Sequence, residues 1–113
     1  MYRETARRRG QAAKERLEAR RERALEVARR GAAVLRQEFG ANPVILFGSA
    51  ARGEGFHDRS DVDLAAGGLI GAGFFAAVAR LQDLSSEFQV DLVPLEDAAP
   101  SLRAAIDREG LPL

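Results

Sequence analysis

Three short apolar segments constrain the fold of this chain more than any other feature. Residues 43–47, 61–66 and 88–93 have the length and the branched or aromatic side chains of β-strands. Each is followed at once by glycine or proline, so none can continue as a long helix. Segments of helical composition separate or flank these runs, and the sequence therefore predicts the order α-β-β-α-β-α.

The first forty residues predict a long amphipathic helix. From Glu15 onward they are rich in Ala, Glu, Arg and Leu, and Gly40 followed by Pro43 suits the end of a helix. Apolar residues recur at intervals of three and four at Leu25, Ala28, Ala32, Leu35 and Phe39. This apolar stripe is thin before Leu25, so residues 1–24 are predicted to be a basic, solvated extension and residues 25–113 the folded domain.

Two shorter helices are predicted later in the chain. The first spans about 74–86, and the second ends near Arg108, before Gly110. In the first of these helices, the residues expected to face the core are Phe74, Phe75, Val78 and Leu81.

Length and composition exclude several classes of protein. At 113 residues the chain is one domain without room for a separate substrate domain. The absence of cysteine excludes disulfides and thiolate sites, and a single histidine excludes a multi-histidine zinc site. No apolar run approaches the roughly 20 residues of a membrane span, and no signal peptide is recognisable, so we expect a cytoplasmic protein.

A net charge of zero hides a basic arm and an acidic body. Residues 1–38 hold twelve Lys and Arg against six Glu, whereas residues 39–113 hold five Arg against eleven Asp and Glu. We interpret the arm as a solvated helix face, with dimerisation or binding of RNA or an acidic partner as alternatives. Because it lacks interleaved aromatic residues, nucleic acid is not the expected partner.

A predicted phosphate-binding turn follows the first strand. Gly48-Ser49 lies between the apolar run and a helical turn, where glycine allows a sharp bend close to a ligand. The serine hydroxyl and the free N–H groups of the turn would point outward together toward phosphate oxygens. Arg52 would add a charge-assisted contact to phosphate or form a surface salt bridge instead.

Three aspartates on two strands predict a metal site. Asp61 and Asp63 are two residues apart in one strand, so their side chains point to the same face. Their Cα atoms should lie roughly 6.5 Å apart. Asp91 is alone among apolar residues in a later strand and would join them if the two strands are neighbours. Grouped carboxylates without nearby cations favour Mg²⁺ and predict phosphoryl or nucleotidyl transfer.

The combined pattern resembles one family. Gly48-Ser-Ala-Ala-Arg-Gly53, Ser60-Asp-Val-Asp-Leu64 and Val90-Asp91-Leu92 are similar to the motifs of the minimal nucleotidyltransferase (MNT) domain of the DNA polymerase β superfamily. The resemblance covers about residues 25–113 and is greatest to MNT antitoxins that pair with HEPN ribonuclease toxins. The basic extension and the glycine-rich stretch 67–73 depart from the family pattern.

This resemblance implies an α+β fold with a small mixed sheet, and an enzyme that transfers AMP from ATP to a hydroxyl group. The expected acceptor is a tyrosine of a HEPN-type toxin. The residues that the resemblance assigns to the nucleotide are Gly48, Ser49, Arg52 and Ser60. Those that it assigns to catalysis and to two Mg²⁺ ions are Asp61, Asp63 and Asp91, and Asp91 would also help deprotonate the attacking hydroxyl.

Two alternatives to this function stay open. The domain could be a non-catalytic binding module that neutralises a partner by covering the partner's active site. It could also transfer nucleotides to a small molecule such as an aminoglycoside, although such enzymes generally bring a second domain for their acceptor.

Overall fold

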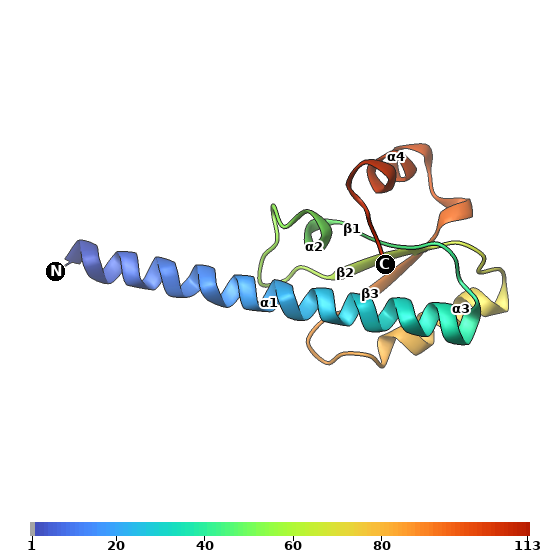
Figure 1. The fold of residues 1–113 in the computed structure, drawn as a ribbon, viewed down its shortest axis with the longest axis horizontal. Helices are drawn as coiled ribbons and strands as arrows, with labels where there is room; N and C mark the ends of the chain where they lie inside the picture. The colour runs from blue at the N-terminus through green and yellow to red at the C-terminus, as the bar shows by residue number, and fades with distance from the viewer. Residues whose placement is uncertain (1) are drawn as a thin grey trace.

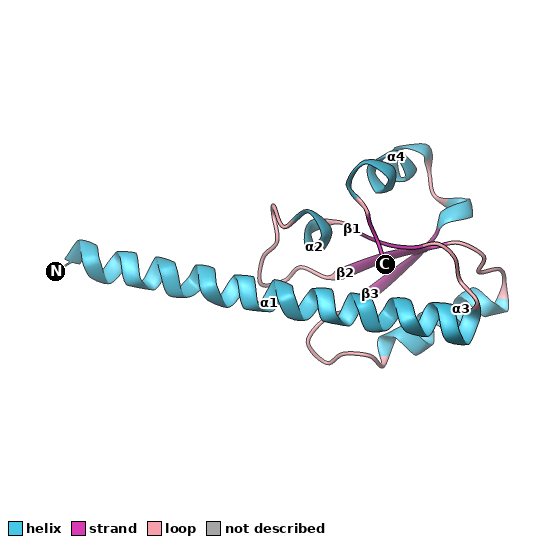
Figure 2. Cartoon of the chain, viewed as in Figure 1, coloured by secondary structure: helices cyan, strands magenta, loops and turns pink. Residues whose placement is uncertain are grey.

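The structure, a computed structural model, describes residues 2–113 and places a four-stranded sheet between two helical layers (Figure 1). The helices are α1 Tyr2–Phe39, α2 Ser49–Arg52, α3 Ala72–Gln82 and α4 Pro100–Glu109, with a 3₁₀ turn at Leu95–Asp97 (Figure 2). The strands are β1 Val44–Phe47, β2 Val62–Ala66, β3 Val90–Pro94 and β4 Leu111–Pro112. The predicted order of the main elements is confirmed, and the structure adds three short elements, α2, the 3₁₀ turn and β4.

The sheet is small and mixed, as the sequence resemblance implies. Its strand order is β3-β2-β1-β4, in which β1 is antiparallel to β2 and β4 while β2 and β3 are parallel. Parallel neighbours need a crossover connection, and α3 supplies it between β2 and β3. The second and third strands are therefore neighbours, which is the condition under which Asp91 can join Asp61 and Asp63.

One face of the sheet is closed by α1 and α3. Alternate residues of β1 and β2 point to this face, because side chains of a strand alternate between its two sides. Residues on this face that are fully buried are Val44, Leu46, Val62, Leu64 and Ala66. They pack against Ala28 and Leu35 of α1 and Leu81 of α3, so the main core lies between the sheet and these two helices.

The opposite face is covered by α4 over only part of its width (Figure 1). Ala65 of β2 packs there with Leu95 and with Ile106 of α4, and Ile45 and Phe47 of β1 extend this smaller cluster. The part of the face that continues from Phe47 across β2 and β3 carries Asp63 and Asp91. α4 therefore seals one part of the face and leaves the predicted acidic residues half-buried.

The long helix α1 continues beyond the sheet and sets the longest dimension of the molecule, 60 Å (Figure 1). Contact with the core begins at Leu17, and Ala24 is completely buried, whereas residues 3–11 and 13–16 are exposed. Gly40 ends the helix with φ +67°, and the following N–H of Ala41 bonds to Leu35 O at 3.0 Å. Within residues 2–113, no helix has the length and apolar character needed to cross a membrane.

The expected division at residue 24 stays a prediction, since α1 passes through that position without a break and Met1 lies outside the described residues.

The expectation that Phe75 belongs to the core is wrong. Phe75 is 72% exposed, whereas Ala77 and Leu81 of the same helix are fully buried. Successive helix residues are separated by about 100°, and Phe75 lies roughly 120° from Leu81 around the helix axis. Phe74 lies close to the direction of Leu81 and packs against the core.

Candidate functional site

The turn after β1 has a backbone conformation that favours glycine. Gly48 has φ +77° and ψ −164°, a region almost confined to glycine. A Cβ atom built on Gly48 would overlap Oδ2 of Asp63, so the missing side chain also leaves room for that carboxylate. The fold thus brings the predicted phosphate turn against the predicted metal ligands.

The helix α2 places Ser49 at its first position and is a single turn long. The N–H groups of Ala51 and Arg52 both donate to Gly48 O at 3.1 Å, which closes the turn. The first N–H groups of a helix have no partner inside it, and here they belong to Ser49 and Ala50. So short a helix has only a small macrodipole, so individual N–H and hydroxyl donors are what it offers to an anion.

Ser60 is buried and links α2 to the loop that precedes β2. Its Oγ accepts hydrogen bonds from the backbone N–H of His57 at 2.9 Å and from Ser49 Oγ at 3.1 Å. In this arrangement Ser60 orients the hydroxyl of Ser49. Its direct contact with a nucleotide stays a prediction.

The three predicted acidic residues lie at the same end of the sheet. Asp63 of β2 pairs in register with Asp91 of β3, so the two carboxylates project from neighbouring strands on the same face. Asp61 immediately precedes β2. A hydrogen bond from Gln89 Nε2 to Asp91 Oδ1, 2.9 Å long, helps to fix the orientation of Asp91.

The electrostatics of Asp63 reflect this grouping. Burial, followed by the negative charges of Asp91 and Asp61, raises the pKa of Asp63 to about 6, and the positive charge of Arg52 opposes the rise. Ionisation of Asp63 is therefore opposed by its burial and by the negative charges of its neighbours. A bound cation would offset both effects.

The donor set fits magnesium when nucleotide phosphates complete the coordination. Mg²⁺ prefers oxygen ligands and usually takes one or two carboxylates together with water and substrate phosphates. Among the residues from 2 to 113, no three acidic or histidine side chains are close enough to form a metal cluster by themselves. Asp63 and Asp91, which pair in register, would supply two of the ligands, and Asp61 immediately before β2 would be the third candidate.

Arg52 takes the second of its two predicted roles in this structure. Its Nη1 forms a salt bridge with Glu109 Oε2 of α4 at 3.1 Å. The guanidinium is still close enough to Asp63 to lower the pKa of that carboxyl. A contact between Arg52 and a phosphate stays a prediction, and it requires the arginine to turn away from Glu109.

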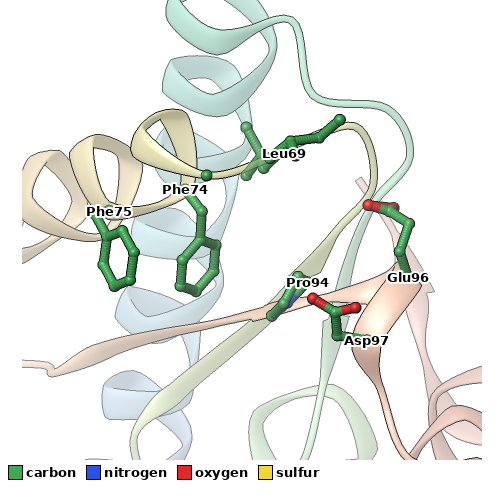
Figure 3. A pocket seen from close by; sticks show the side chains of 8 residues that line it. Leu69, Phe74, Phe75, Pro94, Glu96 and Asp97 are labelled. Atoms are coloured by element: carbon green, nitrogen blue, oxygen red, sulfur yellow. The ribbon is translucent and has the colours of Figure 1, made fainter.

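A separate hollow lies at the opposite end of the sheet (Figure 3). It has a volume of about 470 Å³ and is lined by Leu69, Ile70, Gly71, Phe74, Phe75, Pro94, Glu96 and Asp97. The rings of Phe74 and Phe75 meet edge to face with centroids 5.6 Å apart. Because none of the predicted site residues lines this hollow, we place the candidate site at the carboxylates.

Sequence reasoning missed two residues that border the site, Arg20 and Arg21 of α1. Arg21 donates hydrogen bonds to backbone carbonyls of α2, and Arg20 donates one to a backbone carbonyl of the loop that precedes β2. In the sequence they are indistinguishable from the other arginines of a solvated, basic helix. What distinguishes them is their partial burial, which arises only when α1 packs against the rest of the fold and therefore cannot be seen in the sequence.

Comparison with known proteins identifies the fold. No family profile and no curated protein matches the sequence. A toxin–antitoxin structure with AMP-PNP contains a chain that is 25% identical with a TM-score of 0.60, and the match covers 71% of this chain and 66% of that one. Another match is to a chain in a structure of a tri-AMPylated Shewanella oneidensis HEPN toxin in complex with MNT antitoxin, with a TM-score of 0.59. The two chains are 19% identical, and the match covers 79% of this chain and 70% of that one. At this identity the match supports the fold alone.

A further solved structure is similar to this chain in sequence as well as in fold. It is described as a minimal nucleotidyltransferase and is 34% identical to this chain, with a TM-score of 0.53. The match covers 88% of this chain and 94% of the other, so it extends over nearly the whole of both molecules. Together with the strand order and the turn at Gly48, this similarity means that the chain belongs to the minimal nucleotidyltransferase family.

Proposed function

We propose that this chain is a cytoplasmic, Mg²⁺-dependent nucleotidyltransferase that transfers AMP from ATP to a hydroxyl group of a partner protein. The observation that carries the proposal is the position of Asp63, which pairs in register with Asp91 and fills the space beside Gly48. A turn with free phosphate donors next to paired carboxylates is suited to a nucleoside triphosphate with its cation.

Each residue has a role in this reaction. The first N–H groups of α2 bind and orient the triphosphate, and the Ser49 hydroxyl joins them when it turns away from Ser60. Arg52 adds positive charge when it leaves Glu109. Mg²⁺ held by Asp61, Asp63 and Asp91 would neutralise charge on the reacting phosphate. The acceptor oxygen attacks the α-phosphorus in line, the bond to pyrophosphate breaks, and the hydroxyl proton passes to Asp91.

A HEPN-type toxin is the proposed acceptor, with a tyrosine hydroxyl as the group that receives AMP. Support comes from the toxin–antitoxin structure with AMP-PNP, whose matching chain is 25% identical to this one. The proposed role is therefore that of an antitoxin that modifies its toxin.

The first test is calorimetric titration of ATP into the purified chain, with and without Mg²⁺. We expect Mg²⁺-dependent binding in the natural sequence and its loss in the double variant Asp61→Asn/Asp63→Asn. The matched control is Asp58→Asn, which removes an exposed carboxylate of the neighbouring loop. Binding that is equally strong in the double variant would contradict the proposed site.

The second test measures transfer itself. ATP labelled at the α-phosphate is incubated with the chain and a HEPN-type toxin, and label on the toxin is measured by gel and mass spectrometry. Asp63→Asn should abolish labelling while the chain stays folded. Labelling that persists in this variant would overturn the assignment of Asp63.

A second candidate is a module that neutralises its partner without catalysis. The two candidates differ in one measurement, because a module that only covers a partner would still neutralise a toxin when Asp63 is replaced by Asn. An enzyme would lose neutralisation together with transfer.

A further inference from the structure

Two consecutive arginines of α1 hold backbone groups of the site. Arg21 donates from Nε to Ala50 O at 2.9 Å and from Nη2 to Ala51 O at 3.2 Å. A Cβ atom built on Gly53 would lie 3.1 Å from Arg21 Cζ, so the guanidinium packs directly against the residue that ends α2. Arg21 therefore closes the C-terminal end of the turn whose first residue is Ser49.

Arg20 contacts the loop that precedes β2. Its Nη2 donates to Ser60 O at 3.2 Å, and its Nη1 forms a salt bridge with Glu87 at 3.2 Å. The guanidinium lies over the ring of Phe88, 4.3 Å from the ring centroid. Only 15% of the Arg20 side chain is exposed, and its Nε is buried without a hydrogen-bond partner among the described residues.

The two contacts fall on the two segments that carry the site. Arg21 binds the α2 turn that follows Gly48, and Arg20 binds the carbonyl of the residue immediately before Asp61. Consecutive residues of a helix diverge by about 100°, which allows one turn of α1 to reach both segments. The planar guanidinium suits this task because it donates in fixed directions to more than one carbonyl.

We propose that Arg20 and Arg21 are positioning residues that set the distance between the phosphate-binding turn and the metal-binding carboxylates. Neither residue touches the reacting atoms; each acts through the backbone that carries Ser49 or Asp61. The inference rests on the proposed function for its catalytic meaning, while the ordering of the two loops can be measured without any nucleotide. It also extends the functional part of the chain into the segment before residue 25.

The experiment compares Arg21→Ala, Arg21→Lys and Arg20→Ala with the natural sequence. Arg16→Ala is the matched control, because Arg16 is an exposed arginine on the same helix. Amide hydrogen exchange reports the order of residues 49–53 and 60–63, thermal unfolding reports global stability, and calorimetry with Mg²⁺ and ATP reports the site. Lysine keeps the charge but its single ammonium cannot reproduce the two-carbonyl contact of Arg21.

We expect Arg21→Ala to raise exchange by about tenfold at 49–53 and to weaken Mg²⁺–ATP binding by about tenfold, as loss of charge-assisted hydrogen bonds implies. Arg20→Ala should act mainly on 60–63, Arg21→Lys should be intermediate, and Arg16→Ala should match the natural sequence. Unchanged local exchange, or exchange that rises uniformly along the chain with a fall in unfolding temperature, would overturn the proposal.

If Arg21→Ala does not fold, the same comparison is decided by Arg21→Lys. If the natural chain binds no ATP, the proposed function fails, and the exchange at 49–53 and 60–63 still supports or overturns the positioning role.

Discussion

On the face of the sheet that packs against α1 and α3, Val62 and Leu64 are completely buried, whereas on the opposite face Asp63 is half-buried beside a glycine and a second carboxylate. These residues alternate along the same five-residue strand, β2. The closed face removes apolar surface from water, which stabilises the fold. The open face groups negative charges in a partly buried environment, which costs stability and which a bound cation would relieve.

The largest effect is expected on the closed face. Replacement of Leu64 by Ala should lower the free energy of unfolding by about 3 kcal/mol, because it removes a completely buried side chain and leaves a cavity. Urea denaturation monitored by circular dichroism measures the change. Val93→Ala is the control in the neighbouring strand, on the opposite face and half-buried, and should cost about 1 kcal/mol. Equal losses in the two variants would contradict the asymmetry between the faces.

The turn at Gly48 should be the next most sensitive position. Alanine there must adopt φ +77° and would overlap the Asp63 carboxylate, so Gly48→Ala should cost about 2 kcal/mol and displace Asp63. Mg²⁺–ATP binding, measured by calorimetry, should fall with it.

Gly10→Ala is the matched control for this substitution. Gly10 lies in the exposed part of α1, and a Cβ atom added there would meet no atom within 4 Å, so alanine should stabilise the chain by about 0.5–1 kcal/mol. The same chemical change is therefore expected to have opposite signs at the two positions. A Gly48→Ala variant that is as stable as the Gly10→Ala variant would show that the turn is not constrained as described.

The sequence predicted the residues of the open face better than it predicted their surroundings. Asp61, Asp63 and Gly48 follow from local rules, namely strand alternation and the need for glycine in a sharp turn. The pairing of Asp63 with Asp91 depends on which strands become neighbours, and this is decided by the crossover through α3. Local sequence patterns indicate the candidate residues, whereas the tertiary fold determines which of them lie together.

Two features of the structure could not be predicted from local patterns. Arg20 and Arg21 lie in an arginine-rich helix where most arginines are exposed, and only docking of α1 brings them onto backbone carbonyls. The strand β4 is two residues long and includes Pro112, so it lacks the length and alternation by which strands are recognised. Both depend on contacts between residues far apart in the chain.

The cost of the open face should be visible as a pH dependence. The pKa of Asp63 is raised to about 6 in the folded chain from its ordinary value of 3.8, so the folded state holds this proton more tightly than the unfolded state. In the absence of divalent cations, the contribution of Asp63 to stability therefore falls as pH rises from about 4 to about 6, and stays reduced at higher pH.

Replacement of Asp63 by Asn should remove this dependence and stabilise the metal-free chain at neutral pH by about 1 kcal/mol, allowing for solvent screening. Thermal unfolding in chelator at pH 5 and at pH 7.5 tests the expectation, with Asp58→Asn as the control for loss of an exposed carboxylate. Stabilisation that is the same at both pH values, or absent at pH 7.5, would mean that burial and the neighbouring carboxylates do not raise the pKa of Asp63 as described.

The smallest effect should be that of Phe75→Ser, at the far end of the sheet from the carboxylates. Phe75 is 72% exposed and meets Phe74 edge to face, so its replacement should change stability by less than about 0.5 kcal/mol. Phe74→Ser, one residue earlier, removes a ring that packs against the core and should cost more than about 1 kcal/mol. Urea denaturation measures the free energy of unfolding of both variants. Equal losses of stability would contradict the expectation that only the side of α3 that carries Phe74 packs against the core.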